Sequence, residues 1–129
     1  GTENGGVAIN ILTEKAYTFV EYLDGGLNVA GISVIDFTGS NGDPNVPGTL
    51  HSIHNRGANQ YNMAINSVMH ILLNYDTDKM IPTYGFGGVP SFPPPGLNSK
   101  SVSHFFPCSG DWARAEVYGV HGVFEVYNY

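Results

Sequence analysis

Three oxygen-bearing side chains stand two residues apart just after a strongly apolar stretch. They are Asp36, Thr38 and Ser40. One carboxylate and two hydroxyls form a hard donor set of low charge, which suits Mg²⁺, Mn²⁺ or Ca²⁺ better than zinc. Alternate side chains of an extended loop point the same way, so the spacing predicts that the three converge. The alternative interpretation is an Asp turn at a strand end, with the hydroxyls capping backbone groups.

The chain offers little that resembles catalytic machinery. Position 38 is Thr, so the second acid of an Asp-x-Asp phosphatase loop is missing. Ser40 lies in Thr-Gly-Ser-Asn-Gly, which does not match the Gly-x-Ser-x-Gly elbow of serine hydrolases. His51 and His54 stand three apart without a third ligand nearby, a pattern more typical of polar loop residues than of a zinc site.

The elements around Asp36 decide where its side chain can act. Residues 27–35 are rich in β-branched types and almost uncharged, which predicts a strand covered on both faces in a parallel or mixed α/β sheet. In open α/β sheets, ligands bind beyond the carboxyl ends of the strands, which is where Asp36 falls. Upstream, apolar residues at helical spacing predict a short helix over 16–23, ended by Gly25-Gly26.

Downstream of Asp36, no periodicity returns before Asn59, and a connection of that length in a small domain is more often functional than idle. Asn59 is then the predicted N-cap of a helix that reaches about Tyr75. The remaining predicted elements are a strand over 80–88, a loop of polyproline character over 91–99, a short edge strand over 101–106 and a helix over 117–129.

Length and charge limit the classes of protein to consider. The 129 residues suffice for one domain, and 12% are charged, against about 25% in a typical soluble domain. Five Lys+Arg against 11 Asp+Glu give a net charge of −6, which argues against nucleic acid or an anionic membrane surface as a direct partner. Cys108 is the sole cysteine, so no internal disulfide forms, and a reducing compartment fits.

Several short motifs follow one another in a fixed order between Tyr17 and Tyr127. They are Phe19-Val20-Glu21-Tyr22-Leu23, Ile35-Asp36-Phe37-Thr38-Gly39-Ser40-Asn41-Gly42-Asp43-Pro44, Ser52-Ile53-His54, Asn59-Gln60-Tyr61, Tyr75-Asp76-Thr77-Asp78-Lys79-Met80, Gly85-Phe86-Gly87 and Val102-Ser103-His104. As an ordered set they resemble the von Willebrand factor A-type domain of the copine family. The segment between His104 and Val120 departs from the copine pattern.

The resemblance implies a fold and a metal site. The fold is α/β, a von Willebrand factor A-like, Rossmann-type, mixed and mostly parallel sheet flanked by helices; residues 1–15 would be a lead-in and 16–129 the N-terminal part of the domain. Asp36, Thr38 and Ser40 match the first part of a metal-ion-dependent adhesion site. In that site, hydroxyls ligate Mg²⁺ or Mn²⁺ and an acidic residue of a partner protein completes the coordination shell. The family's further Thr and Asp ligands would lie beyond Tyr129, so we expect a C-terminally truncated domain with an incomplete site.

The resemblance also implies a function. It predicts a non-enzymatic, divalent-cation-assisted protein–protein interaction module of a calcium-dependent phospholipid-binding adaptor. That adaptor would be cytoplasmic and recruited to membranes, with Ca²⁺ and phospholipid bound only through C2 domains outside this chain. The alternative is the partner-binding A domain of a RING-type E3 ubiquitin ligase. Without its later strands, the sheet would expose an apolar edge at residues 27–35, from which we expect self-association.

Overall fold

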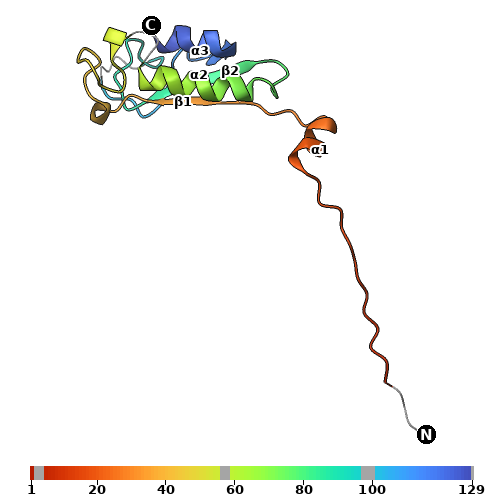
Figure 1. Ribbon diagram of the computed structural model, residues 1–129. Helices are drawn as coiled ribbons and strands as arrows, with labels where there is room; N and C mark the ends of the chain where they lie inside the picture. The colour runs from red at the N-terminus through yellow and green to blue at the C-terminus, as the bar shows by residue number, and fades with distance from the viewer. Residues whose placement is uncertain (2–4, 56–58, 97–100, 129) are drawn as a thin grey trace.

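The computed structural model describes residues 1, 5–55, 59–96 and 101–128. In chain order the elements are α1 (Phe19–Asp24), β1 (Ser33–Asp36), η1 (Gly39–Asn41), η2 (Ile53–Asn55), α2 (Gln60–Leu72), β2 (Met80–Phe86), β3 (Phe106–Pro107), β4 (Glu116–Tyr118) and α3 (Gly119–Tyr127). The N-terminal segment and α1 extend away from the body formed by the sheet, α2 and α3 (Figure 1). None of the helices described is long and apolar enough to cross a membrane.

β2 is the centre of the sheet. On one side it pairs in parallel with β1, from Ser33 opposite Thr83 to Asp36 opposite Phe86, and this is the longest ladder. On the other side it pairs antiparallel with β4 and then with β3. β3 and β4 therefore act as one antiparallel strand, interrupted by an excursion over residues 109–114. The prediction of a mixed α/β sheet flanked by helices is confirmed.

Both long helices cover the same face of this sheet. Ile35 of β1 and Ile81 of β2 are buried on that face, against Ile65 and Met69 of α2 and Val123 of α3. Burying such side chains contributes roughly 1.5–3 kcal/mol each before the cost of ordering the chain. This core fixes the position of β1 relative to α2, and therefore also the position of the loop that follows β1.

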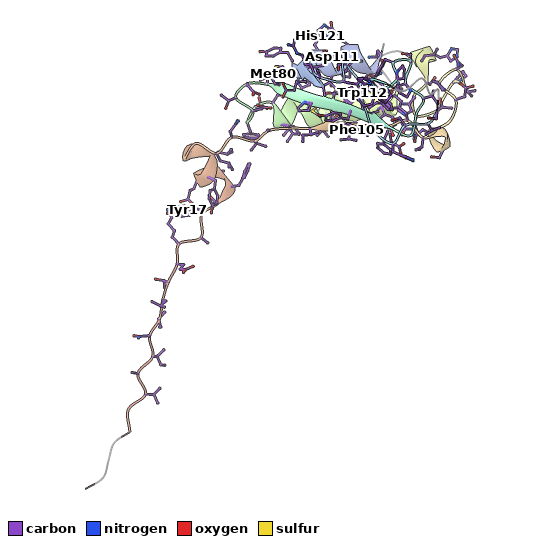
Figure 2. The ribbon with its side chains drawn as sticks, turned by 180° about the vertical axis from the view of Figure 1, so that it is seen from behind. Tyr17, Met80, Phe105, Asp111, Trp112 and His121 are labelled. Carbon is purple, nitrogen blue, oxygen red and sulfur yellow. The ribbon has the colours of Figure 1, made fainter. Side chains whose placement is uncertain are left out.

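The opposite face of the sheet is open. Seen from behind, β2 lies in front of the helices (Figure 2). Ile32 and Val34 are 65% and 59% exposed, so the expectation that the first strand is covered on both faces is wrong for the described residues. Tyr84 is partly shielded by the ring of Phe105, whose centroid lies 4.7 Å from its own.

Several element boundaries differ from the predictions, each for a local reason. α1 begins at Phe19, later than expected, because Thr18 and Glu21 form a capping box at its start. The first strand is regular only from Ser33, since the residues before it form a lead-in whose Val29 N–H bonds to the carbonyl of Tyr75. The edge strand expected over 101–106 is reduced to one bridge, between Gly88 and Ser103, followed by β3.

Three further boundaries also changed. β2 ends at Phe86 rather than at residue 88, and α2 ends at Leu72 rather than near Tyr75. β4 occupies the start of the segment predicted as a helix over 117–129, and α3 begins only at Gly119, where φ is 63°. Residues 97–99 of the predicted loop and residue 129 of the predicted helix lie outside the described residues.

Candidate functional site

The residues proposed as cation ligands lie at the carboxyl end of β1. Asp36 is the last residue of the strand, and its carboxylate Oδ1 accepts the N–H of Thr38 at 2.8 Å. The hydroxyl oxygens of Thr38 and Ser40 are 3.0 Å apart. The structure therefore brings the three predicted residues together. The cause is the 3₁₀ turn η1 rather than alternation along an extended loop, so that part of the prediction is wrong.

The alternative interpretation of these residues holds only for the aspartate. Asp36 does form an Asp turn with the backbone of Thr38. Thr38 is the N-cap of η1, but its side chain makes no capping hydrogen bond, and its hydroxyl meets that of Ser40 instead. The two hydroxyls thus form an exposed pair of oxygens beside a carboxylate.

The carboxylate of Asp36 is held in its charged form. The backbone N–H of Thr38 is the largest influence that lowers its pKa; the Thr38 hydroxyl also lowers it, while partial desolvation opposes them. Asn41 and the imidazole of His51 lower this pKa further, by smaller amounts. Asp36 is therefore ionised at neutral pH and supplies a negative charge next to the hydroxyl pair.

This donor set fits a small divalent cation. Ligand oxygens at about 2.0–2.1 Å in octahedral geometry lie roughly 3.0 Å from their neighbours, the separation that Mg²⁺ requires. The Thr38 and Ser40 hydroxyls already have that separation. Within the part of the chain that the structure describes, no three His, Cys, Asp or Glu side chains gather closely enough to hold a metal. A cation at Asp36 would thus depend on the hydroxyl oxygens, and on ligands from elsewhere.

A glycine at the end of β2 makes room for the loop. Gly87 has φ 75°, and a Cβ built there would overlap the Cγ2 methyl of Thr38. Next to it, the Phe37 N–H donates to the carbonyl of Phe86 at 2.8 Å and so continues the β1–β2 ladder. The end of β2 thereby sets the position of Thr38.

His51 is the centre of the contacts behind this loop. Its Nε2 lies 2.6 Å from the carbonyl oxygen of Asp36, and its Nδ1 lies 2.9 Å from the hydroxyl of Tyr127. Since a carbonyl only accepts hydrogen bonds, Nε2 carries a proton. The imidazole stacks between Phe37 and Tyr61, at centroid distances of 5.0 and 4.0 Å. His51 therefore joins the end of β1, helix α2 and the end of α3.

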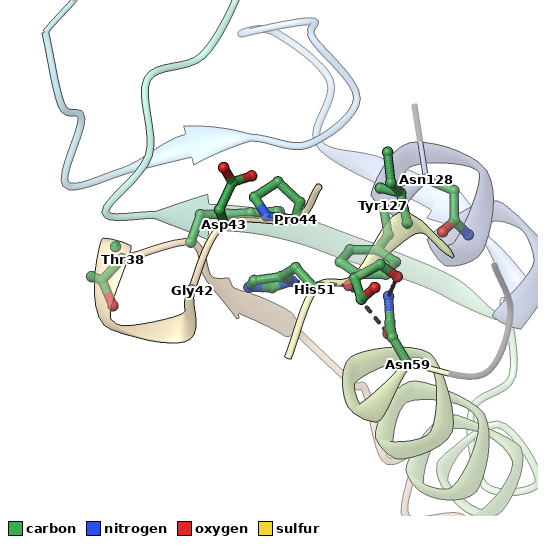
Figure 3. A pocket seen from close by; sticks show the side chains of 12 residues that line it. Thr38, Gly42, Asp43, Pro44, His51, Asn59, Tyr127 and Asn128 are labelled. Atoms are coloured by element: carbon green, nitrogen blue, oxygen red, sulfur yellow. Dashed lines mark hydrogen bonds between the residues drawn. The ribbon is translucent and has the colours of Figure 1, made fainter. Parts of the chain in front are cut away.

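Two asparagines complete this support. Asn41 Nδ2 donates to the same Asp36 carbonyl at 2.7 Å, so two side chains hold that peptide group. Asn59 Oδ1 caps α2 by accepting the N–H of Asn62 at 2.8 Å, and it also accepts the Tyr127 hydroxyl at 3.3 Å (Figure 3). Asn59 was predicted as a cap, but its bond to Tyr127 was not.

The supporting residues escaped the sequence analysis because their contacts are not local. His51 meets Tyr127 across 76 positions of the chain, and Asn59 meets it across 68. No spacing rule relates such positions. His51 and His54, interpreted from the sequence as polar loop residues rather than a zinc site, make separate contacts, and His54 Nε2 lies 2.6 Å from the carbonyl oxygen of Asn45.

A cavity of about 600 Å³ opens beside the loop. Thr38 and Gly42 lie at one end of it and Tyr127 and Asn128 at the other, with His51 between them (Figure 3). The complete lining is Phe37, Thr38, Gly39, Gly42, Asp43, Pro44, His51, Ser52, Ile53, Asn59, Tyr127 and Asn128. A volume of this size accommodates a small ligand or one or two side chains of a partner.

Comparison with known proteins identifies a matching family model and two related proteins. The family model described as Copine matches residues 49–129. Copine-A from Dictyostelium discoideum is 40% identical over 129 residues, which cover 98% of this chain and 20% of that protein. Protein BONZAI 2 from Arabidopsis thaliana is 41% identical over 113 residues, or 87% of this chain and 18% of that protein. The chain thus spans about a fifth of the length of these curated relatives, and it belongs to the copine family.

Proposed function

We propose that this chain provides a divalent-cation-assisted surface for binding other proteins and does not act as an enzyme. The observation that supports it most directly is the exposed hydroxyl pair of Thr38 and Ser40, at ligand spacing, beside the ionised carboxylate of Asp36. Mg²⁺ or Mn²⁺ bound by one carboxylate and two neutral hydroxyls keeps a net positive charge, because the carboxylate cancels only half of the charge of the cation. Such a cation attracts an external anion, and a carboxylate of a partner protein is the anion we expect.

The cavity beside the loop supports the same proposal, because it offers space for a side chain of the partner protein. Thr38 belongs both to the proposed ligand set and to the cavity wall. A partner whose acidic residue reaches the cation can place a neighbouring side chain against Phe37, Pro44 and Ile53. The exposed Asp43 at the edge of the cavity would then orient the partner's backbone.

Family membership bears on the rest of the polypeptide. The two relatives named above are a copine and a BONZAI protein, which favours the copine setting over a ubiquitin ligase. We therefore propose an adaptor that is cytoplasmic and moves to membranes, with Ca²⁺ and phospholipid bound by C2 domains outside this chain. The domain described here would recruit the target protein.

Calorimetric titration of Mg²⁺ and Mn²⁺ tests the cation site. We expect weak or undetectable binding to this chain and clear binding to a form that includes more of the full-length polypeptide beyond Tyr129. Asp36→Ala should abolish the binding of the longer form. Asp43→Ala is the matched control, because that carboxylate lies in the same loop but bonds to Asn45.

Two outcomes would contradict the proposal. Equal cation binding by the wild type and Asp36→Ala would remove Asp36 from the site. Equal affinity of the short and long forms would mean that no further ligands are needed and that the account of an incomplete site is wrong.

A further inference from the structure

The dipeptide Asn41-Gly42, at the end of η1, is chemically labile. The backbone nitrogen of a residue that follows asparagine can attack the side-chain Cγ of that asparagine. Glycine favours this attack, because it has no side chain in the way and its backbone adjusts freely. The attack expels ammonia and closes a succinimide ring, and water then opens the ring to aspartate or isoaspartate. The net change takes up water, releases ammonia and turns the carboxamide into a carboxyl group.

The fold requires the glycine of this pair. Gly42 has φ 86° and ψ 165°, a combination that is essentially confined to glycine. A Cβ built on it would lie 2.7 Å from Cγ2 of Thr49 and 3.0 Å from the Cβ of Thr49. Another residue would therefore be strained and would displace Thr49. The loop thus depends on the glycine that makes Asn41 reactive.

Hydrogen bonds restrain both reacting groups in the folded chain. The N–H of Gly42 donates to the carbonyl of Gly39 at 3.1 Å. Asn41 Nδ2 donates to the carbonyl of Asp36 at 2.7 Å and to the hydroxyl of Tyr61 at 3.3 Å. These bonds direct the carboxamide and the glycine nitrogen toward different acceptors. The attack therefore requires η1 to open.

η1 is a short element that can open locally. It has three residues, and the hydrogen bonds of 3₁₀ turns have poorer geometry than those of α-helices. Its Asn41 N–H donates to the carbonyl of Thr38 at 3.0 Å. Gly39 and Ser40 are exposed, and Gly42 borders the cavity described above, so water has access to the loop (Figure 3). Opening such a segment costs less free energy than unfolding the whole chain.

We propose that Asn41 is a site of spontaneous deamidation and that the opening of η1 controls its rate. Conversion removes the Nδ2 donor and places a carboxylate next to the carbonyl oxygen of Asp36, so the support at the end of β1 weakens. Isoaspartate also adds a methylene group to the backbone of the turn. This proposal rests on the hydrogen bonds of the loop and not on the proposed cation site.

Incubation of the purified chain at mildly alkaline pH, followed by peptide mass spectrometry, tests the proposal. We expect the peptide that contains Asn41 to gain the mass of the amide-to-acid exchange and to be methylated by an isoaspartate methyltransferase. Asn45 is the internal control, because it is exposed in the same loop but is followed by the β-branched Val46, and its conversion should be at least about tenfold slower. Urea should accelerate the reaction at Asn41 at least about fivefold.

Three results would overturn the proposal. The first is no conversion of Asn41 in the folded chain, and the second is conversion no faster than that of Asn45. The third is an equal rate at Asn41 with and without urea, which would mean that η1 does not control the reaction.

Variants test the hydrogen bonds directly. Tyr61→Phe removes one acceptor of the Asn41 amide but keeps the ring that stacks on His51, so conversion should accelerate about two- to threefold. Tyr75→Phe, beyond the other end of α2, should leave the rate unchanged. Asn41→Asp mimics one product and should unfold at a lower urea concentration than the wild type. An unchanged rate in Tyr61→Phe, or an Asn41→Asp variant as stable as the wild type, would contradict the proposed role of these bonds.

Discussion

The imidazole of His51 and the carbonyl of Asp36 form a hydrogen bond of 2.6 Å at the end of β1. The same ring bonds through Nδ1 to Tyr127, the last residue of α3. The peptide that carries the proposed cation ligands is thus fixed from behind by a side chain that also holds a distant helix. A shift of α3 or of the end of β1 would therefore also displace the His51 ring.

His51→Ala should destabilise the fold. The variant loses two hydrogen bonds and a ring stacked between Phe37 and Tyr61, so we expect a loss of about 2–4 kcal/mol in the free energy of unfolding. Urea unfolding measures it. His54→Ala is the control, since His54 makes one exposed bond and its loss should cost under about 1 kcal/mol. Equal effects of the two substitutions would refute the central position of His51.

Gly87→Ala should disturb the loop itself. The substitution forces φ 75° on a residue with a Cβ and drives that Cβ into Thr38, so we expect a loss of at least about 2 kcal/mol and displaced resonances of Thr38 and Ser40. Gly48→Ala separates the two causes, because it carries the backbone cost without the contact. Gly48 has φ 87°, but nothing lies near its added Cβ, so only the backbone cost remains. A Gly87 variant no less stable than the Gly48 variant would show that the contact with Thr38 is unimportant.

Cys108 should be a slow nucleophile in the folded chain. Burial raises the pKa of its thiol to about 11. At pH 8 this leaves only about one thiolate in a thousand, so alkylation by iodoacetamide should accelerate strongly when urea unfolds the protein. Because the pKa is higher in the folded state than in the unfolded state, the thiol's contribution to stability is present below the unfolded pKa. It is lost as the pH rises toward the folded value.

Removing the thiol provides the control for this pH dependence. Cys108→Ala should flatten the decline in stability between about pH 8.5 and 11, whatever its effect at neutral pH. Equal alkylation rates with and without urea would mean that Cys108 is accessible and unperturbed in the folded state.

We propose that the free edge of β1 permits self-association. In the described residues β1 pairs with β2 alone, and Ile32 and Val34 on its open face are largely exposed. An unpaired strand edge flanked by apolar side chains is a template for a second copy. Sedimentation equilibrium should therefore show a mass that rises with concentration for the wild type and not for Val34→Lys. A wild type that stays monomeric at all concentrations tested would exclude the edge as a contact.

The parts of this fold that the sequence predicts are those that local chemistry determines. α2 starts where the side chain of Asn59 can cap it, and its buried residues fall at helical spacing. β4 was missed because Glu116–Tyr118 is too short to show a period and leads directly into α3. Their spacing and the family resemblance singled out Asp36, Thr38 and Ser40, which the structure brings together. The ring of His51 that supports them was not singled out, because tertiary packing brings it there.

The extended N-terminal segment in Figure 1 affects how the size of this protein must be measured. Val7, Ile9, Ile11 and Leu12 are between 78% and 94% exposed, so the segment adds friction without adding a compact volume. A single chain of 13.9 kDa should therefore elute from a gel-filtration column earlier than a globular standard of equal mass. An early peak on its own would mimic a dimer, and only a method independent of molecular shape distinguishes a long monomer from two chains joined at β1.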